Sequence, residues 1–222
     1  MGCRGGSTRL ADEWRLANRT ESDVFTGIVE ATVKVLGVRD EAGSRKLTLE
    51  RIGDDLKPGQ SVAVNGVCLT VADLTTGKGA SMSFDLVAET LKVTNLGRLV
   101  AGDGVHVERS LAANGRLDGH FVLGHIDGMV SLVSQVEDDN GVRLILKAAK
   151  ELAKYLIPKG SVAIDGVSLT IASIKGETFE VALIPTTMRL TMLTNQPEDW
   201  MFNLETDVLS KTVVSWLERR GK

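Results

Sequence analysis

The feature that most constrains the fold of this chain is an internal duplication. Residues 61–72 read SVAVNGVCLTVA and residues 161–172 read SVAIDGVSLTIA, and eight of these twelve positions are identical. Two further matches keep the same order: FDLVAETLKVTNL (84–96) with VALIPTTMRLTML (181–193), and GIVEATV (27–33) with GHIDGMV (124–130). Three matches at nearly one spacing indicate tandem domains of about 95 residues each.

Each repeat reads as short strands separated by turns. Apolar and polar residues alternate through VEATVKVLGV and RKLTLE in the first repeat, and through MVSLVSQV and VRLILK in the second. Turn residues separate these pairs at 40–43 and 138–141, and the pairs Asn65-Gly66 and Asp165-Gly166 are strong hairpin signals. The pattern predicts a mainly β chain with one small antiparallel barrel in each half.

Helical periodicity is confined to short segments. Residues 88–96 and 149–157 are brief helical patches, and residues 207–220 form an amphipathic helix whose apolar stripe consists of Leu209, Val213, Trp216 and Leu217. The first repeat has no counterpart of this terminal helix. The helix either docks on its own domain or joins copies of the chain, and the missing counterpart slightly favours the second.

Composition excludes several classes of function. Twenty-six Lys and Arg against 29 Asp and Glu give a formal net charge of −3, so no basic excess is available to bind a nucleic acid. No run approaches the roughly 18 apolar residues of a membrane span. Two cysteines, Cys3 and Cys68, and three histidines show no metal-ligand spacing. We expect no metal, no nucleic-acid or membrane partner, and a cytoplasmic location.

The first 23 residues do not read as a targeting signal. They contain arginines but no apolar core of a secretory signal, and their four acidic residues argue against a mitochondrial presequence. We expect residues 1–23 to be a poorly ordered extension, with ordered structure beginning at Val24.

Several motifs carry a resemblance to a known family. They are FTGIVE (25–30), SVAVNGVCLTV (61–71), FDLVAETL (84–91), TNLG (94–97), GHFVLGHIDG (119–128), SVAIDGVSLTI (161–171), LIPTT (183–187) and NLETD (203–207). Together they resemble the riboflavin synthase family. The resemblance implies two six-stranded antiparallel Greek-key barrels, at 24–120 and 121–206, and a trimerisation helix at 207–222 in a homotrimer. The family's initiator methionine falls on Val24, which suggests an alternative start codon.

The resemblance also implies a reaction. In a dismutation, one molecule of 6,7-dimethyl-8-ribityllumazine transfers a four-carbon unit to another, which gives riboflavin and 5-amino-6-(ribitylamino)pyrimidinedione. Because both reactants are the same compound, two similar pockets must act in opposite roles, and a duplicated barrel supplies them. The acidic 7-methyl group of the substrate makes a strong base unnecessary, so stacking of the two rings supplies much of the acceleration. No cofactor is implied.

Positions at which the repeats diverge should separate the two roles. The resemblance implies four catalytic residues: Cys68 as a nucleophile or water-orienting thiol, His125 as a proton carrier, Ser168 as a pocket hydroxyl, and Asp207 as a ribityl or relay contact across subunits. Read without the resemblance, Cys68 is a buried strand cysteine and Asp207 caps the terminal helix. We expect His120 to pack at the barrel junction and His106 to lie on the surface.

The resemblance implies a larger set of substrate-binding positions. Gly27–Val29 would bind the pyrimidine edge through the backbone, which favours glycine, and Ile184 and Thr187 would do so in the second barrel. Thr186, where many relatives carry His, departs from the family pattern. The full set is Gly27, Ile28, Val29, Ser61, Cys68, Leu69, Thr70, Asp85, Leu86, Val87, Ala88, Glu89, Thr90, Gly124, His125, Ile126, Tyr155, Lys159, Ser168, Leu169, Thr170, Ile184, Pro185, Thr186, Thr187, Met188 and Arg189.

Three alternatives remain open from the sequence. A lumazine-binding relative without catalysis uses one barrel only, whereas motifs are intact in both halves. A flavin-reductase type of barrel needs an R-x-Y-[ST] motif, and the only tyrosine, Tyr155, lies in LAKYLI. A pure interaction module predicts no small-molecule pocket in either repeat.

Overall fold

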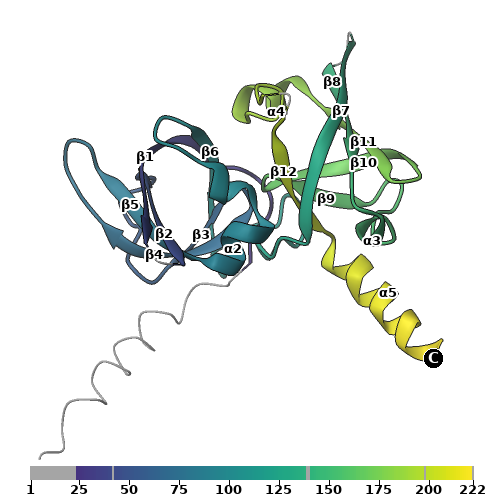
Figure 1. The fold of residues 1–222 in the computed structure, drawn as a ribbon, viewed down its shortest axis with the longest axis horizontal. Coiled ribbons are helices and arrows are strands. Elements are labelled where there is room, and N and C mark those ends of the chain that lie inside the picture. The colour runs from purple at the N-terminus through teal and green to yellow at the C-terminus, as the bar shows by residue number, and fades with distance from the viewer. Residues whose placement is uncertain (1–23, 42, 139–140, 198, 222) are drawn as a thin grey trace, which may run out of the picture.

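The two repeats fold into two closed six-stranded antiparallel barrels that lie side by side (Figure 1). The computed structural model describes residues 24–41, 43–138, 141–197 and 199–221. The expected extension at 1–23 lies outside the described residues. A terminal helix projects from the second barrel (Figure 1). The prediction of a mainly β chain with two barrels and a C-terminal helix is confirmed.

Both barrels close with the same strand order. In the first, the neighbours around the ring are β1-β2-β5-β4-β3-β6, and the second repeats this connectivity with β7 to β12. Strands that are not consecutive in the sequence, such as β1 and β6, are hydrogen-bonded neighbours, so connections must cross over the barrel. The strands are β1 (Ala31–Glu41), β2 (Ser44–Glu50), β3 (Ser61–Val64), β4 (Val67–Leu74), β5 (Ser81–Val87), β6 (Gly104–Arg109), β7 (Gly128–Asp138), β8 (Gly141–Lys147), β9 (Ser161–Ile164), β10 (Val167–Lys175), β11 (Thr178–Leu183) and β12 (Met201–Thr206).

Short helices close the barrel corners. The second predicted patch, 149–157, is helical only over one turn. The helices are α2 (Ala88–Val93) and the 3₁₀ helix η1 (Asn95–Arg98) after β5, α3 (Lys150–Ala153) after β8, α4 (Pro185–Leu190) after β11, and α5 (Val208–Arg220) at the end.

Alternation along the strands decides which side chains face outward. In β4, the side chains of Val67, Leu69 and Val71 are buried in the barrel core, whereas Cys68 and Thr70 point away from it. Strand β10 repeats this pattern. The outer face of each barrel therefore carries the residues that the sequence marks for function.

The two predicted hairpin turns meet back to back between the barrels. Asn65 (φ 44°) and Gly66 (φ 78°) both have the left-handed backbone of a type I′ turn, as do Asp165 and Gly166 (43° and 79°). A Cβ added at Gly66 would lie 2.6 Å from the backbone N of Gly166. The sequence predicts each turn, but only the tertiary structure brings them into contact.

Replacing Gly66 with alanine should destabilise the protein more than replacing Gly77 with alanine. Both glycines have a left-handed φ (78° and 85°), so each substitution costs about 1–2 kcal/mol of backbone strain. Only at Gly66 would the new methyl group collide with the facing turn, which adds about 1–3 kcal/mol of overpacking. At Gly77 nothing lies within 4 Å of the added carbon. Urea unfolding measures both losses, and equal losses would contradict a tight contact between the turns.

A buried polar network joins the barrels around these turns. Oδ1 of Asp165 accepts hydrogen bonds from Nδ2 of Asn95 (2.8 Å) and from the backbone N of Asn203 (2.7 Å), and Oδ2 accepts from Nε1 of Trp200 (3.0 Å). Burial raises the pKa of Asp165 to about 7, against the effect of these donors. Partners from both repeats thus complete one network, which specifies how the barrels are oriented.

The prediction that His106 lies on the surface is wrong. Its side chain is 2% exposed, because the second barrel covers the outer face of β6. Nδ1 lies 2.9 Å from the carbonyl O of Asp165, and Nε2 accepts from the backbone N of Met192 (2.8 Å), so the ring is neutral with its proton on Nδ1. Burial lowers the pKa of His106 to about 4. The stability from this neutral ring is present above pH 6.5 and is lost as the pH falls through about 4.

Helix α5 is anchored at its start and leaves its apolar stripe exposed. Asp207 caps the helix, with Oδ1 accepting from the backbone N of Leu209 (2.7 Å). Lys211 Nζ lies 2.9 Å from Oδ1 of Asp127 on the second barrel. The stripe of Leu209, Val213, Trp216 and Leu217 is 52–62% exposed, so the helix does not dock on its own barrel through that face. None of the helices in the described part of the chain is long and apolar enough to cross a membrane.

Candidate functional site

The residues predicted for the first binding site lie on the outer face of β4, and we call this part of the surface the first candidate pocket. Cys68 and Thr70 point outward there, and Ser61 on β3 pairs with Thr70. The backbone N of Cys68 donates to the carbonyl O of Gly124 (3.0 Å), and Ile126 packs against the core of the first barrel. This pocket is therefore completed by a segment that precedes the second barrel.

The second candidate pocket is built in the same way on β10. Ser168 and Thr170 occupy the places of Cys68 and Thr70, and Ser161 on β9 pairs with Thr170. The backbone N of Ser168 donates to the carbonyl O of Gly27 (2.7 Å). Val29 packs against the core of the second barrel.

The two repeats thus exchange their first segments. The carbonyl O of Gly27 and the side chain of Val29 contact the second barrel, whereas the carbonyl O of Gly124 and the side chain of Ile126 contact the first. Phe25 and Val122 pair with each other where the two segments cross. The N–H groups of Gly27 and Gly124 still bond to the last strand of their own repeats. The predicted backbone contacts of Gly27–Val29 to the pyrimidine edge stay a prediction, but this crossing brings the segment beside the second barrel as well as the first. Sequence order cannot show it, because either assignment leaves the same motifs in the same positions along the chain.

Two glycines permit the exchange. Gly27 and Gly124 have φ values of 76° and 73°, which L residues rarely adopt. A Cβ at Gly27 would lie 2.6 Å from Cβ of Ser168, and one at Gly124 would lie 2.5 Å from Cβ of Cys68. The close approach that favours glycine at these positions is therefore an approach to the strand of the opposite barrel.

The remaining predicted residues fall into three groups. Val87 (62% exposed) and Ile184 (60% exposed) occupy equivalent exposed corners before α2 and α4. Three predicted substrate contacts point into the barrel cores instead, namely Leu69, Leu86 and Leu169. The other exposed or half-buried members are Asp85, Ala88, Glu89 and Thr90 on the first barrel and Tyr155, Lys159, Pro185, Thr186, Thr187, Met188 and Arg189 on the second.

Ser168 is paired with a histidine that sequence reasoning treated as a packing residue. Nδ1 of His120 lies 2.8 Å from Oγ of Ser168. His120 is 8% exposed, and Nε2 has no hydrogen-bond partner among the residues that the structure describes. Burial lowers the pKa of His120, and the charge of Asp207 acts in the opposite direction. His120, Ser168 and Asp207 therefore come from distant segments and lie close enough to interact. Ser168 and Asp207 are predicted site residues, and the sequence signal for His120 is that it shares one motif with the predicted His125.

The first pocket has different chemistry at the equivalent place. Cys68 is partly exposed and packs against a small buried cluster that includes Phe25 and Val122. His125 follows Gly124 directly and is exposed. The two pockets therefore share a backbone framework, but one offers a thiol and an exposed imidazole whereas the other offers a hydroxyl bonded to a buried imidazole.

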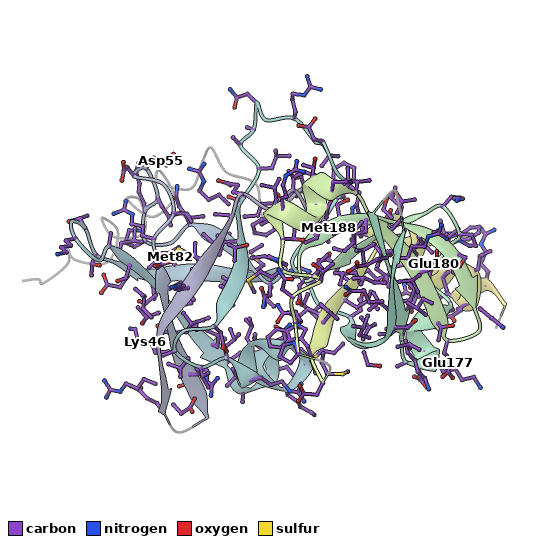
Figure 2. The ribbon with its side chains drawn as sticks, turned by 90° about the horizontal axis from the view of Figure 1, so that it is seen from above. Lys46, Asp55, Met82, Glu177, Glu180 and Met188 are labelled. Carbon is purple, nitrogen blue, oxygen red and sulfur yellow. The ribbon has the colours of Figure 1, made fainter. Side chains whose placement is uncertain are left out.

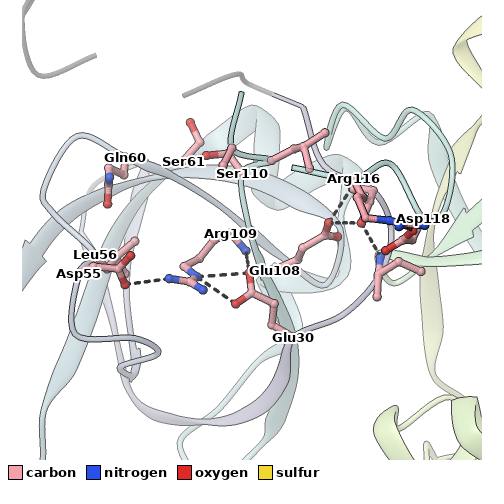
Figure 3. Close-up of a pocket in the computed structure, with 14 residues that line it drawn as sticks. Glu30, Asp55, Leu56, Gln60, Ser61, Glu108, Arg109, Ser110, Arg116 and Asp118 are labelled. Atoms are coloured by element: carbon pink, nitrogen blue, oxygen red, sulfur yellow. Dashed lines mark hydrogen bonds and ion pairs between the residues drawn. The ribbon is translucent and has the colours of Figure 1, made fainter. Parts of the chain in front are cut away.

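Two hollows lie at the edges of the candidate pockets. A cavity of about 420 Å³ includes Ile28 and Ser61 in its lining, and Figure 3 shows Arg109 within it between Glu30 (Nε–Oε2 2.9 Å) and Asp55 (Nη1–Oδ1 2.8 Å). Sequence reasoning missed its charged residues. A hollow of about 570 Å³ beside α4 is lined by Pro185, Met188 and Arg189 together with Glu137, Gly141, Val142, Thr194 and Asn195. Figure 2, seen from above, shows Met188 on α4, over the region between the two barrels.

Among the residues that the structure describes, no group of three or more His, Cys, Asp or Glu side chains could hold a metal ion.

Comparison with protein families identifies both repeats. The family of the lumazine binding domain matches the chain twice, over residues 26–110 and 123–207. Each match begins in an exchanged segment and ends just beyond the last strand of a barrel.

Similar proteins of known activity match nearly the whole chain. The riboflavin synthase of Bacillus subtilis (strain 168) is 38% identical over 201 residues, which cover 90% of this chain and 92% of that protein. The riboflavin synthase of Mycobacterium tuberculosis (strain ATCC 25618 / H37Rv) is 37% identical over 203 residues, which cover 89% and 100%. That of Escherichia coli (strain K12) is 36% identical over 200 residues, which cover 88% and 92%.

Solved structures share the tandem-barrel fold. The structure of LumP complexed with riboflavin has a TM-score of 0.74 at 22% identity and covers 82% of this chain and 98% of that chain. The structure of LumP complexed with 6,7-dimethyl-8-(1'-D-ribityl) lumazine has a TM-score of 0.72 at 21% identity, with the same coverage.

Proposed function

This chain belongs to the riboflavin synthase family, and on that premise we propose how its two barrels divide the reaction. The enzyme is a transferase that moves a four-carbon unit between two molecules of 6,7-dimethyl-8-ribityllumazine. One molecule becomes riboflavin and the other leaves as 5-amino-6-(ribitylamino)pyrimidinedione. The observation that carries our proposal is the pair of equivalent pockets with different side chains at Cys68 and Ser168.

We assign one substrate molecule to each pocket. Thr70 and Thr170 are exposed, and each has a serine beside it on the paired strand, so hydroxyl groups line an outer face where the ribityl chain and ring edge can bind. The backbone of Gly27–Val29 borders the second pocket and that of Gly124–Ile126 borders the first. The apolar Val87 and Ile184 offer exposed surface for the dimethyl-substituted ring.

The proton chemistry belongs to the second pocket. A serine hydroxyl that donates to a neutral imidazole can take a proton from the acidic 7-methyl group while its own proton passes to the imidazole nitrogen, and the reverse transfer returns the proton later. Ser168 and His120 have this arrangement, and the lowered pKa of His120 keeps the ring neutral near pH 7. In the first pocket, the thiol of Cys68 can add to the ring or orient a water.

The two rings must stack with reacting atoms about 3–3.5 Å apart, and we propose that they do so between subunits. Within one chain, a buried cluster of Phe25, Ala63, Val122 and Ala163 fills the space between the pockets, each member 3% exposed or less. The pocket of a first barrel must therefore face the pocket of a second barrel from another copy. A homotrimer, which we propose for this chain, allows such head-to-tail pairing in a closed ring.

The proposed function is tested by incubating the purified protein with 6,7-dimethyl-8-ribityllumazine alone. Absorbance should show one mole of riboflavin formed for every two moles of lumazine consumed, because two substrate molecules give one molecule of riboflavin. Calorimetry with riboflavin should show two binding events per chain. Binding of riboflavin without its formation from lumazine would mean that the chain is a lumazine-binding protein without this activity.

We also propose that the enzyme works in the cytoplasm, where its substrate would have to be made.

Deleting α5 should break the trimer. Leu209, Val213, Trp216 and Leu217 are exposed in the single chain, and burying each between copies offers about 1.5–3 kcal/mol. Sedimentation of a chain ending at Asp207 should show monomers, whereas the intact chain should sediment as the proposed trimer. A truncated chain that stays trimeric would show that the barrels alone hold the copies together.

Replacing Cys68 with serine should lower turnover without unfolding the protein. Ser168 shows that this barrel geometry accepts serine at the equivalent strand position, so little packing is lost. The expected loss is about 10²-fold in kcat, since a thiol is the better nucleophile near neutral pH. Steady-state kinetics measures it, with the thermal unfolding midpoint as the control. Full activity in the variant would make Cys68 a strand residue only.

A further inference from the structure

Two buried glutamates occupy equivalent positions on the last strands of the barrels. Glu108 on β6 is 5% exposed and Glu205 on β12 is 2% exposed. Burial raises the pKa of both carboxyl groups, that of Glu205 to about 7. Neither residue belongs to the sets of catalytic and substrate-binding positions predicted from the sequence, and a buried carboxyl group at this place in both repeats requires a physical explanation.

Each carboxylate accepts hydrogen bonds from two consecutive backbone N–H groups. Glu108 accepts from Thr26 N (2.6 Å) and Gly27 N (3.0 Å), and also from Oγ1 of Thr26 (2.8 Å). Glu205 accepts from Leu123 N (2.8 Å) and Gly124 N (2.9 Å). Consecutive N–H groups beside a left-handed glycine form a concave site that binds an anion, and here the anion is a side chain of the same protein.

These bonds reach the opposite pocket through one residue. Gly27 donates its N–H to Glu108, and its carbonyl O accepts from the backbone N of Ser168 at 2.7 Å. In the other half, Glu205 holds Gly124, whose carbonyl accepts from Cys68 at 3.0 Å. Two consecutive hydrogen bonds thus connect Glu108 to Ser168 on the second barrel, and two connect Glu205 to Cys68 on the first.

We propose that Glu108 and Glu205 are positioning residues that act crosswise. Glu205 of the second barrel sets Gly124 and His125 in the first pocket, and Glu108 of the first barrel sets Gly27 and Ile28 in the second pocket. The arrangement makes neither pocket complete without the other repeat. The proposal rests on the pockets of the proposed function.

Glutamine is the informative substitution at both positions. It has the same shape, but it offers one acceptor oxygen where two N–H groups converge, and its NH₂ group faces one of them. A buried backbone N–H left without an acceptor makes the segment shift. Thr26→Val is a second variant that leaves the carboxylate in place. It removes one of three bonds to Glu108, and also the bond that Oγ1 of Thr26 accepts from the backbone N of Ile28 (3.1 Å).

The first measurement is the rate of alkylation of Cys68 by iodoacetamide in the intact chain, quantified on the Cys68 peptide. Glu205→Gln should change this rate at least threefold, because Gly124 packs directly on Cys68. Glu108→Gln, which acts on the other segment, should leave the rate within a factor of about 1.5. Equal changes in both variants, or a change in Glu108→Gln alone, would overturn the proposal. This readout does not depend on where the substrate binds.

The second measurement is riboflavin binding in combined variants. Thr70→Val should weaken one site and Thr170→Val the other, and if neither weakens binding the pocket assignment of the proposed function fails. Glu205→Gln should weaken riboflavin binding at the first pocket about tenfold. Adding Thr170→Val should then also weaken the second pocket, so that no tight site remains, whereas adding Thr70→Val should leave the second pocket tight. Glu108→Gln and Thr26→Val should show the mirror pattern. Non-crossed pairing, in which each glutamate affects the pocket of its own barrel, would overturn the proposal. Thermal unfolding of each variant identifies any that does not fold.

Discussion

Replacing His120 with glutamine should lower kcat by about 10²–10⁴-fold while riboflavin binding stays within a few-fold of that of the unchanged protein. Nδ1 of His120 lies 2.8 Å from Oγ of Ser168. A glutamine keeps a polar group at this position but cannot accept a proton at neutral pH. Ser168→Ala should cost about as much, and the double variant little more, because two groups that act as one unit are not additive. Steady-state kinetics of the three variants measures this.

The matched control is His125→Gln. His125 was the histidine that sequence reasoning assigned to proton transfer, and it is exposed in the first pocket. If His125→Gln shows the large loss and His120→Gln does not, the proton carrier is in the first pocket and our assignment to Ser168 and His120 is wrong.

The pH profile offers a second check on His120. Because burial lowers the pKa of His120, the ring is neutral at pH 7 and becomes protonated only below pH 6.5. A protonated ring cannot accept the methyl proton, so kcat should fall as the pH falls through that lowered value. The acid limb should be absent from the residual activity of His120→Gln.

Mixing two inactive variants should raise riboflavin synthase activity from background to a substantial fraction of the activity of the unchanged protein. The first variant carries Cys68→Ala and Thr70→Val, and the second carries Ser168→Ala and Thr170→Val. Each chain then has one intact pocket. If pockets from neighbouring copies meet, random mixed rings contain roughly a quarter of interfaces in which both pockets are intact.

The measurement is riboflavin formation after the two variants are unfolded and refolded together. Each variant refolded alone is the control and should stay inactive. If both pockets of one site came from the same chain, every site in the mixture would still contain a damaged pocket. Inactivity in mixed trimers confirmed by mass spectrometry would therefore contradict a site between subunits.

The duplication allowed much of the fold to be predicted. Repeated motifs, alternating strands and two Asn-Gly or Asp-Gly turns are local signals, and each barrel obeys them. The alternation Val67, Cys68, Leu69, Thr70 also shows which side chains leave the core. Leu69 and Leu169 could have been excluded as side-chain contacts on this ground.

The errors share one physical cause. A period of two residues tells which face of a strand fills its own barrel, but it does not tell what covers the other face. His106 stands on the outer face of β6 and is buried because the second barrel lies against it. Glu108 stands on the same face and bonds to Thr26 and Gly27 of its own repeat. His120 came out as a packing residue because its partner, Ser168, is 48 residues away.

Two barrels, their hairpins, a terminal helix and a family of pocket residues could be predicted, because they follow from repeats, periodicity and turn chemistry over a few residues. The crossing of the segments 25–29 and 122–126 to the opposite barrels is visible in the tertiary structure alone. It depends on backbone hydrogen bonds between the two repeats, from Ser168 N to Gly27 O and from Cys68 N to Gly124 O. Such bonds form only when the two barrels meet, so no local pattern in the sequence records them.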